Sequence, residues 1–397
     1  MDPLHALNAW LDAAPNRERT GDFSGIRLDL YRAFLRHLPL PPAPCIVAGT
    51  KGKGSTVRLI ESILLGHGQQ TIAFTSPHVR SVCERWRVGG RPVAPEVLLP
   101  LTVLVAAAEQ RSGIALTYFE RTAALAVLLA ADHPGCQLLW EVGLGGRLDC
   151  ANALDCSVAV LTHLSHDHRE VLGPTLTHIA REKLAIARPG RPLVIAPQSA
   201  PAQAAIAVQL PDGVPVTWVE RQPDGFTLRL FGDHQLDNAS TALTAARLLL
   251  PQLDESCARA AMADVRLAAR CQVVQHGDRR LLIDGAHNGP SVAATIAVAR
   301  QTLAPGWRLV LGLATDKEID EIMAVLPAEA AVHRCAYDSP RARGRHDWPA
   351  ALLSTPWHAS IGAALAALPH GDLCITGSFY LAGEALLLTD AAGVLPG

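Results

Sequence analysis

Aromatic residues, long apolar runs and any excess of charge are scarce in this sequence. Aromatic side chains make up 5% of the 397 residues, and 35 Lys and Arg stand against 37 Asp and Glu, a formal net charge of −2. Balanced charge without a long basic run, together with few rings for base stacking, argues against nucleic acid as the main partner. We therefore expect small-molecule substrates and no nucleic-acid partner.

Signals for secretion, for a membrane span and for disulfides are equally scarce. The N-terminus shows no basic region followed by an apolar core, and the longest apolar stretches, 101–108 and 122–131, are shorter than the ~18 residues of a membrane span. The nine cysteines are scattered singly, without a C-x-x-C pair, which is typical of reduced thiols. We expect a cytoplasmic protein with no membrane partner.

A glycine-rich loop follows directly on an apolar strand. The segment Cys45-Ile-Val-Ala-Gly-Thr-Lys-Gly-Lys-Gly-Ser-Thr56 leads into the helical pattern 57–65. Its glycines let backbone N–H groups surround an anion, while Lys53 adds charge and Ser55 a hydroxyl for Mg²⁺. Gly54 separates these two, so the standard phosphate-loop pattern is not matched. The alternative is a turn without a ligand, but two lysines in one tight loop repel each other unless an anion compensates. The loop predicts a cradle for a nucleotide triphosphate.

Short apolar runs alternate with amphipathic stretches, which predicts an α/β fold of mostly parallel sheets covered by helices. The predicted strands are 45–48, 71–75, 137–140, 158–162, 193–196, 281–284, 309–311 and 373–376. The predicted helices include 95–111, 118–131, 175–188, 238–250 and 291–303. The polar segment 211–233 predicts two short antiparallel strands, 214–219 and 226–231. A boundary near 266–270 predicts a large domain, 1–267, and a smaller Rossmann-like domain, 268–397.

Glu141 stands at a predicted strand end, where ligands bind in parallel sheets. It is either a Mg²⁺ ligand or an acceptor for loop N–H groups, and the phosphate loop on the same sheet favours the metal. The glycines that follow it, Gly143, Gly145 and Gly146, suggest a close approach of the backbone to a substrate.

Three histidines follow the strand 158–162. Their spacing does not suit a zinc-binding helix, because the segment comes after a strand. We favour His168 as a functional residue beside Glu141, with Asp167 to orient it, and expect His163 and His166 to be bystanders.

Two further patterns have structural alternatives. The residues alone favour a solvated charged helix face for 181–183. Asp284 is either an acceptor for a ribose hydroxyl or a helix cap, and His287 suits a phosphate, although a plain strand–turn–helix cap explains both almost as well.

Together these segments resemble the folylpolyglutamate synthase and dihydrofolate synthase family, which is related to the Mur ligases. The ordered motifs, covering almost the whole chain, are Gly49-Thr-Lys-Gly-Lys-Gly-Ser55, Thr75-Ser-Pro-His78 with Glu84-Arg-Trp-Arg87, Thr117-Tyr-Phe-Glu120, Glu141-Val-Gly-Leu-Gly-Gly-Arg-Leu-Asp149, Asp167-His168 with Leu172-Gly173, Ile179-Ala-Arg-Glu-Lys183, His234-Gln235 with Asn238-Ala239, Asp284-Gly-Ala-His-Asn288, Asp316-Lys317 and Thr376-Gly-Ser378.

The resemblance implies a phosphate-loop NTPase-like domain followed by a glutamate-ligase domain, and a role for each matching residue. ATP contacts are implied for Lys51, Gly52, Lys53, Gly54, Ser55, Thr56, Asn238, Arg270, Asp284 and His287. Two Mg²⁺ sites are implied, with ligands from Ser55, Ser76, Glu141, His168 and Lys183. Pteroate contacts are implied for Asp22, Phe23, Ser24, Thr117, Tyr118, Phe119, Glu120, Leu148, Asp149 and Cys150. Lys53, Lys183 and His168 are implied to be catalytic, Lys183 as a carbamate, which turns a cation into an anionic metal ligand.

Six residues at four places depart from the family pattern. Lys51 replaces a common Asn, Ala268-Ala269 stands where Pro-Gly is usual, and Leu184 replaces a small residue beside the implied carbamate. Phe23-Ser24 departs from Leu-Gly, which weakens the pteroate assignment most.

The resemblance implies an ATP-dependent, cytoplasmic, monomeric ligase of folate biosynthesis and one-carbon metabolism that adds L-glutamate to dihydropteroate or to folates through an acyl phosphate. The alternatives are a Mur-type amino-acid ligase with another acceptor, or a phosphate-loop ATPase that drives a conformational switch. The sequence leaves open which folate reaction is catalysed.

Overall fold

The computed structural model describes residues 2–23, 25–221, 225–315, 317 and 319–389. Contacts divide these residues into two compact units. The first runs up to Val265 without 79–81 and 230–232, and the second contains those two short segments and everything from Arg266 onward. Both units are α/β, as predicted.

The first unit contains an eight-stranded sheet in the order β4-β3-β2-β5-β1-β6-β7-β8. The strands are β1 Cys45–Ala48, β2 Thr71–Phe74, β3 Trp86–Val88, β4 Arg91–Pro92, β5 Gln137–Glu141, β6 Val158–Leu161, β7 Leu193–Ile195 and β8 Val216–Trp218. All neighbours from β2 to β8 are parallel, and the hairpin β3–β4 adds two antiparallel edge strands. Because Val47 is in register with Glu141 and Ala48 with Leu161, the loops after β1, β5 and β6 leave the sheet at one edge.

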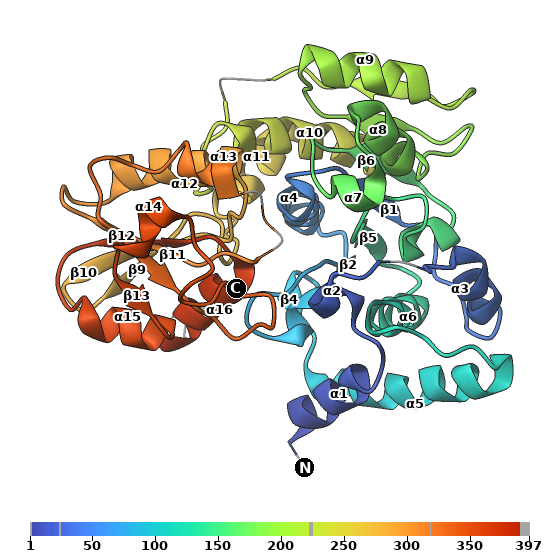
Figure 1. Ribbon diagram of the computed structural model, residues 1–397. Helices are drawn as coiled ribbons and strands as arrows, with labels where there is room; N and C mark the ends of the chain where they lie inside the picture. The colour runs from blue at the N-terminus through green and yellow to red at the C-terminus, as the bar shows by residue number, and fades with distance from the viewer. Residues whose placement is uncertain (1, 24, 222–224, 316, 318, 390–397) are drawn as a thin grey trace. The chain divides into compact units, whose positions relative to one another are not determined.

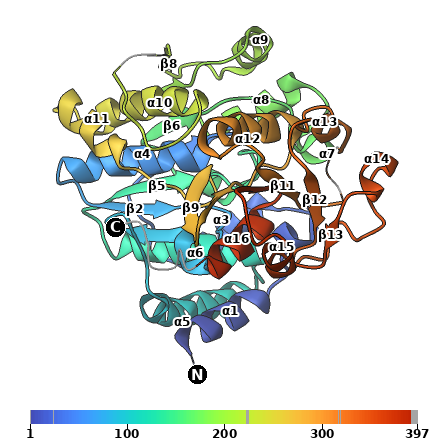
Figure 2. The same ribbon diagram turned by 90° about the vertical axis from the view of Figure 1, so that its left-hand side faces the viewer.

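Helices cover both faces of this sheet (Figures 1 and 2). One side carries α4 Lys53–Gly66, α10 His234–Leu249 and α11 Glu255–Ala263, and the other carries α1 Pro3–Asp12, α5 Pro95–Ser112 and α6 Tyr118–Ala131. The remaining helical segments are α2 Arg17–Thr20, α3 Leu28–Leu35, α7 Arg169–Leu172, α8 Leu176–Leu184, α9 Ala200–Gln209 and the 3₁₀ turns η1 Val82–Arg85 and η2 Cys150–Ala153.

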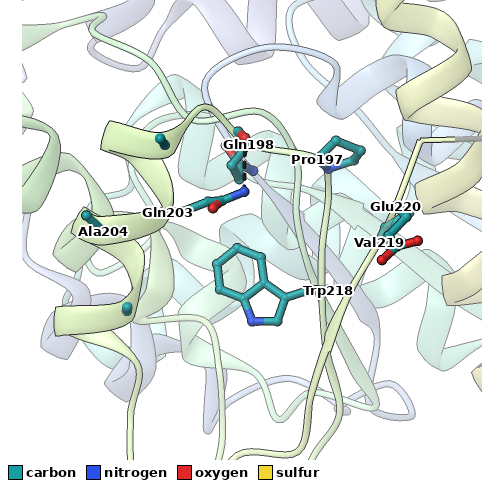
Figure 3. Close-up of a pocket in the computed structure, with 9 residues that line it drawn as sticks. Pro197, Gln198, Gln203, Ala204, Trp218, Val219 and Glu220 are labelled. Carbon is teal, nitrogen blue, oxygen red and sulfur yellow. Dashed lines mark hydrogen bonds between the residues drawn. The ribbon is translucent and has the colours of Figure 1, made fainter.

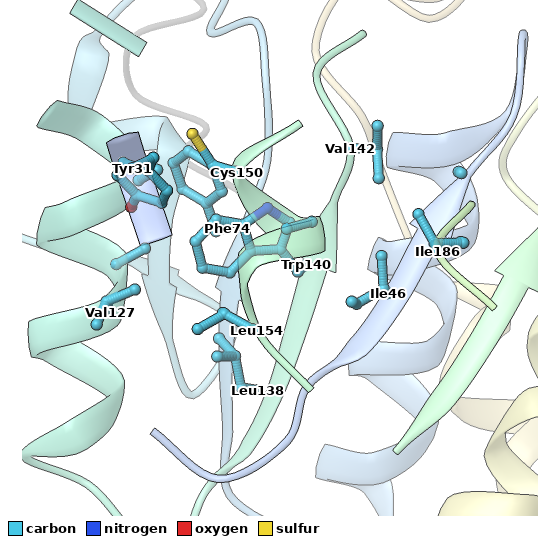
Figure 4. Packing of buried hydrophobic residues seen from close by; sticks show 14 of the residues in the cluster. Tyr31, Ile46, Phe74, Val127, Leu138, Trp140, Val142, Cys150, Leu154 and Ile186 are labelled. Atoms are coloured by element: carbon cyan, nitrogen blue, oxygen red, sulfur yellow. The ribbon is translucent and has the colours of Figure 1, made fainter. Parts of the chain in front are cut away.

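Large aromatic side chains form the centre of the first unit's core (Figure 4). The Phe74 and Trp140 rings lie 4.7 Å apart on neighbouring strands, and Trp86 donates its indole N–H to the carbonyl of Thr122, 3.0 Å away. Trp86 and Trp140 are fully buried. This cluster anchors β2, β3, β5 and α6 to one another beneath the loops of the candidate site.

The second unit has a six-stranded sheet in the order β13-β12-β11-β14-β10-β9, parallel except for the pair β9–β10. The strands are β9 Gln272–His276, β10 Arg279–Ile283, β11 Arg308–Leu311, β12 Val332–Cys335, β13 Trp357–His358 and β14 Leu373–Thr376. The helices are α12 Gly289–Thr302, α13 Ile319–Met323, α14 Ala350–Leu353, α15 Ile361–Ala367 and α16 Phe379–Leu388. Two hydrophobic clusters occupy its two faces.

The antiparallel pair predicted within 211–233 is wrong. β8 lies inside the first predicted stretch but pairs with β7 in parallel, and residues 226–231 form no strand. Phe226 packs instead against the guanidinium of Arg259, 4.5 Å from the ring centre, and Arg229 N–H donates to the Ala263 carbonyl. Contacts with α11 therefore replace the expected strand pairing.

All nine cysteines are free, and seven of them are buried: Cys45, Cys83, Cys150, Cys156, Cys271, Cys335 and Cys374. Burial raises the pKa of the Cys156 thiol to about 11. No helix in the described ranges is long and apolar enough to cross a membrane.

Candidate active site

The glycine-rich loop lies between β1 and α4, at the carboxyl edge of the sheet. Gly52 has φ +87°, and a Cβ there would lie 3.0 Å from Cγ of Asn238 and closer still to its Oδ1. Gly49 has φ +152° and packs equally closely on Thr162. The loop thus needs glycine at both positions, because of its backbone conformation and because there is no space for a side chain. The fold also places Asn238 of α10 against Gly52 of this loop.

Two lysine ammonium groups meet at one carbonyl in this loop. Lys183 Nζ donates to Gly49 O at 2.9 Å, and Lys53 Nζ lies 3.3 Å from the same oxygen. Lys183 is 4% exposed, and burial followed by the charge of Lys53 lowers its pKa to about 7. The solvated face expected for 181–183 is therefore wrong for Lys183, although Arg181 is exposed. An amine that is partly neutral near pH 7 is a nucleophile, which an ordinary ammonium is not.

Glu141 lies beside this loop at the end of β5. Its side chain is buried, its Oε2 accepts from Ser76 N–H at 3.1 Å, and a Cβ on Gly54 would lie 3.4 Å from that oxygen. No three His, Cys, Asp or Glu side chains converge as a metal cage in the described residues. The oxygen-rich set of Glu141, Ser55 and Ser76 still fits Mg²⁺, since that ion is typically held by few protein oxygens plus substrate phosphates.

His168 has a left-handed backbone, φ +49°, immediately before α7. Asp167 Oδ1 accepts from the His168 backbone N–H at 3.0 Å, so its hydrogen bond orients the backbone at this position. The His168 ring lies edge-on to Phe23, 6.5 Å between centres. His163 contributes its backbone, since its carbonyl accepts from Thr50 and Lys51 of the glycine-rich loop.

The loop after Glu141 packs closely against two helices of the first unit. A Cβ at Gly146 would lie 2.9 Å from Glu182 O and 3.0 Å from Lys183 O, and one at Gly143 would lie 2.7 Å from the ring of Phe119. Gly146 and Gly143 therefore pack tightly against α8 and α6, and the close approach of a substrate to this backbone stays a prediction. That packing holds Lys183 in place.

The predicted pteroate residues 117–120 begin α6. Thr117 Oγ1 accepts from Glu120 N–H, and Glu120 Oε2 accepts from Thr117 N–H at 2.8 Å, forming a capping box. Tyr118 is buried. The motif therefore has a structural role in starting the helix, whatever it binds.

Asp149 is buried directly after the glycine loop. Its carboxylate accepts from Gly143 N–H and Ala151 N–H, both at 2.9 Å, while burial raises its pKa to about 6. Leu148 and Cys150 pack in the core. Asp22 and Phe23 follow α2, and Ser24 lies outside the described residues.

The predicted nucleotide residues of the second unit surround the end of β10. Asp284 accepts from Cys271 N–H at 2.7 Å, Ala286 N–H at 2.8 Å and Thr295 Oγ1 at 2.9 Å. The cap of α12 is Asn288, whose side chain accepts from Ser291 N–H, so Asp284 does not cap this helix.

Arg270 and His287 both lie near Phe379. The Arg270 guanidinium is 4.6 Å from the Phe379 ring centre, and the His287 ring is 6.2 Å from it. Ala269, where the family pattern has Gly, is fully buried with φ +53°. Leu184 lies in the core cluster of the first unit, and Asp316 is outside the described residues.

A groove was not predicted from the sequence (Figure 3). It lies between α9 and the end of β8, has a volume of about 590 Å³ and exposes the Trp218 indole. Gln203 donates to the carbonyl of Gln198 on its wall. Its lining residues come from two separate stretches, 197–207 and 218–220, and mix polar with apolar side chains, so no sequence pattern marks the groove.

A phosphate-type glycine loop, flanked by two lysines and a carboxylate at the carboxyl edge of a parallel sheet, defines an α/β nucleotide-binding protein. No family model matches the chain. It is 30% identical over 411 residues to the dihydrofolate synthase/folylpolyglutamate synthase of Escherichia coli, covering 97% of this chain and 96% of that protein. The Bacillus subtilis protein of the same name is 31% identical over 331 residues, 75% of this chain and 77% of that protein.

Solved structures give the same result. One is a bifunctional folylpolyglutamate synthase/dihydrofolate synthase with Mn, AMPPNP and L-glutamate bound, with TM-score 0.84, 27% identity and 98% of both chains covered. Another is E. coli FolC in complex with DHPP and ADP, with TM-score 0.82, 27% identity and 99% of both chains covered. The chain belongs to the folylpolyglutamate synthase/dihydrofolate synthase family.

Proposed function

We propose that this protein is an ATP-dependent ligase that joins L-glutamate to dihydropteroate, to a folate, or to both. The observation that carries the proposal is the pair of lysines beside Glu141 at the glycine-rich loop. Relatives that cover the whole chain are synthases of this kind, and their structures contain ADP or AMPPNP, Mn and L-glutamate.

The reaction requires a carboxylate to lose an oxygen, which is a poor leaving group. ATP transfers its γ-phosphoryl to the substrate carboxylate, the amine of glutamate attacks the acyl phosphate, and phosphate leaves. Lys53 offsets the charge that accumulates between the two anions, and the loop N–H groups hold the phosphates.

Bound magnesium would neutralise phosphate charge and polarise the transferred phosphoryl group. The residues proposed to hold it at two sites are Ser55, Ser76, Glu141 and His168, together with Lys183 as a carbamate. The low pKa of Lys183 favours this modification, because carbamate formation requires the neutral amine. Mass spectrometry of the intact protein with and without bicarbonate tests it.

The remaining roles follow the same proposal. Asn238, Arg270, Asp284 and His287 contact the nucleotide, and the segments 22–24, 117–120 and 148–150 contact pteroate. Residues 1–267 form the ATP-binding domain and 268–397 the glutamate-ligase domain of a cytoplasmic monomer.

The test measures ADP release with ATP, glutamate and either dihydropteroate or tetrahydrofolate. We expect release that depends on both glutamate and a pterin substrate, and its loss in Lys53→Ala. Release indifferent to glutamate would instead indicate an ATPase switch, and activity within a few-fold of the parent in Lys53→Ala would refute the role of that lysine.

A further inference from the structure

Arg85 has no role in the site described so far, yet it is among the most deeply buried charges of the first unit. Its side chain is 1% exposed. Its NH1 and NH2 groups donate to the two carboxylate oxygens of Glu18, at 3.1 and 2.6 Å. A bidentate pair of this kind, buried on the Arg85 side, is geometrically specific, because the planar guanidinium matches the carboxylate only in one orientation.

The same guanidinium reaches two further segments. Its Nε donates to Nδ1 of His78, 3.0 Å away, and its Cζ lies 5.4 Å from the centre of the Tyr118 ring. Since the arginine Nε–H can only donate, His78 Nδ1 is the acceptor of this hydrogen bond. The Arg85 carbonyl also accepts from Thr75 N–H at 2.9 Å, which holds the start of the 75–78 loop.

Glu18 belongs to α2, a single turn with no buried residue. Asn16 caps the turn, and Gly21 ends it with φ +74°. Asp22 and Phe23 come next, and Arg17 NH1 lies 3.4 Å from Asp22 O. The Glu18–Arg85 pair therefore ties this exposed turn to the segment that leads into β3. A second tie lies just before the turn, where Pro15 O accepts from Tyr118 N–H at 3.0 Å.

The Arg85 side chain therefore contacts three segments: His78 in the loop that carries the proposed metal ligand Ser76, Tyr118 at the start of α6, and α2, which directly precedes the proposed pteroate residues 22–23. We propose that Arg85, with Glu18, is a positioning residue that sets the pteroate-binding segments relative to one another. This inference rests on the proposed function, because it assumes that these segments bind the substrate.

The inference predicts a selective kinetic defect. In Glu18→Gln, which keeps the shape of the side chain but removes its charge, KM for the pterin substrate that the parent uses, dihydropteroate or tetrahydrofolate, should rise by ~10-fold or more, since small displacements of binding groups are costly. KM for ATP should change less than about two-fold, because the phosphate loop is held by other contacts. Arg85→Lys should raise the same KM, since Lys keeps the charge but lacks the planar guanidinium that binds both carboxylate oxygens.

Asp155→Asn is the matched control. It removes the charge from an ion pair of the same unit, with Arg191 at 3.1 Å, whose side chains are 49% and 59% exposed. We expect it to leave both KM values unchanged. A double variant, Glu18→Leu with Arg85→Met, replaces the pair with apolar groups of similar size and should fold while keeping the raised KM.

The outcomes separate the two proposals. If the parent protein shows no glutamate-dependent ADP release, the proposed function fails. If the parent is active and Glu18→Gln has an unchanged KM for the same pterin substrate, or if KM for ATP rises equally, the positioning role is overturned while the proposed function stands. Loss of folded protein in all three variants would likewise overturn it, because the pair would then serve stability alone.

Discussion

Gly52→Ala tests whether the phosphate loop is fixed by the contact between Gly52 and Asn238. Alanine at φ +87° carries a left-handed backbone cost of about 1–2 kcal/mol. Its Cβ would also overlap Asn238 Oδ1, and forced overpacking adds about 1–3 kcal/mol. We therefore expect the free energy of unfolding to fall by about 2–5 kcal/mol.

Gly68→Ala is the control for the free-energy cost of placing alanine in a left-handed backbone conformation. Gly68 has φ +79° and nothing within 4 Å of an added Cβ. The free energy of unfolding of Gly68→Ala should therefore fall by only about 1–2 kcal/mol. In the double variant Gly52→Ala with Asn238→Ala, the overlap is removed, and the two changes should be non-additive by about 0.5–3 kcal/mol.

The assay is urea unfolding followed by circular dichroism, paired with calorimetric titration of magnesium ATP. Gly52→Ala should lose nucleotide affinity, and Gly68→Ala should keep it. Equal losses of stability in Gly52→Ala and Gly68→Ala would refute the contact, and full nucleotide affinity in Gly52→Ala would show that the loop tolerates a side chain.

Three further substitutions test the buried charges and the helix cap. The pKa of the Lys183 amine falls from 10.5 to about 7 on folding. The free energy of unfolding should therefore rise between pH 7 and pH 10.5, by up to about 5 kcal/mol. Urea unfolding of Lys183→Met in carbonate-free buffer should lack this rise. The pKa of Asp149 rises from 3.8 to about 6, so stability is full below pH 3.8 and should fall by about 3 kcal/mol as pH rises through 6, a decline that Asp149→Asn should remove. Glu120→Ala breaks the capping box and should lower the free energy of unfolding by about 0.5–2 kcal/mol, measured by urea unfolding. An unchanged pH dependence in Lys183→Met or Asp149→Asn would contradict the pKa assigned to that residue, and an unchanged free energy of unfolding in Glu120→Ala would contradict the role of the capping box.

The sequence was most informative where one local pattern decides the structure. The apolar run after Thr117 gives α6 its predicted bounds, because a capping box starts it and its middle is fully buried. β1 likewise has its predicted bounds, since a short apolar run before a glycine-rich loop suits a central parallel strand. By contrast, the hairpin β3–β4 was not predicted, because its strands are short and only the Gly89-Gly90 turn marks it.

Contacts between segments that are far apart in the chain could not be predicted from local sequence patterns. The charged run 181–183 has the composition of a solvated face, yet the fold turns Lys183 inward onto Gly49 O. The contact of Asn238 with Gly52 joins α10 to a loop far away in the chain. Glu18 lies in an unremarkable polar stretch and Arg85 in a motif for which the resemblance implied no role, and only the tertiary structure shows that the two meet.

The seven buried thiols can report when the structure around each of them opens. Cys45, Cys83, Cys150 and Cys156 lie in the first unit, and Cys271, Cys335 and Cys374 in the second. Because only the thiolate reacts with alkylating agents, a pulse of iodoacetamide will label each one only when its surroundings come apart. Peptide mapping of the labelled sites can then time the loosening of each unit separately, without any engineered probe.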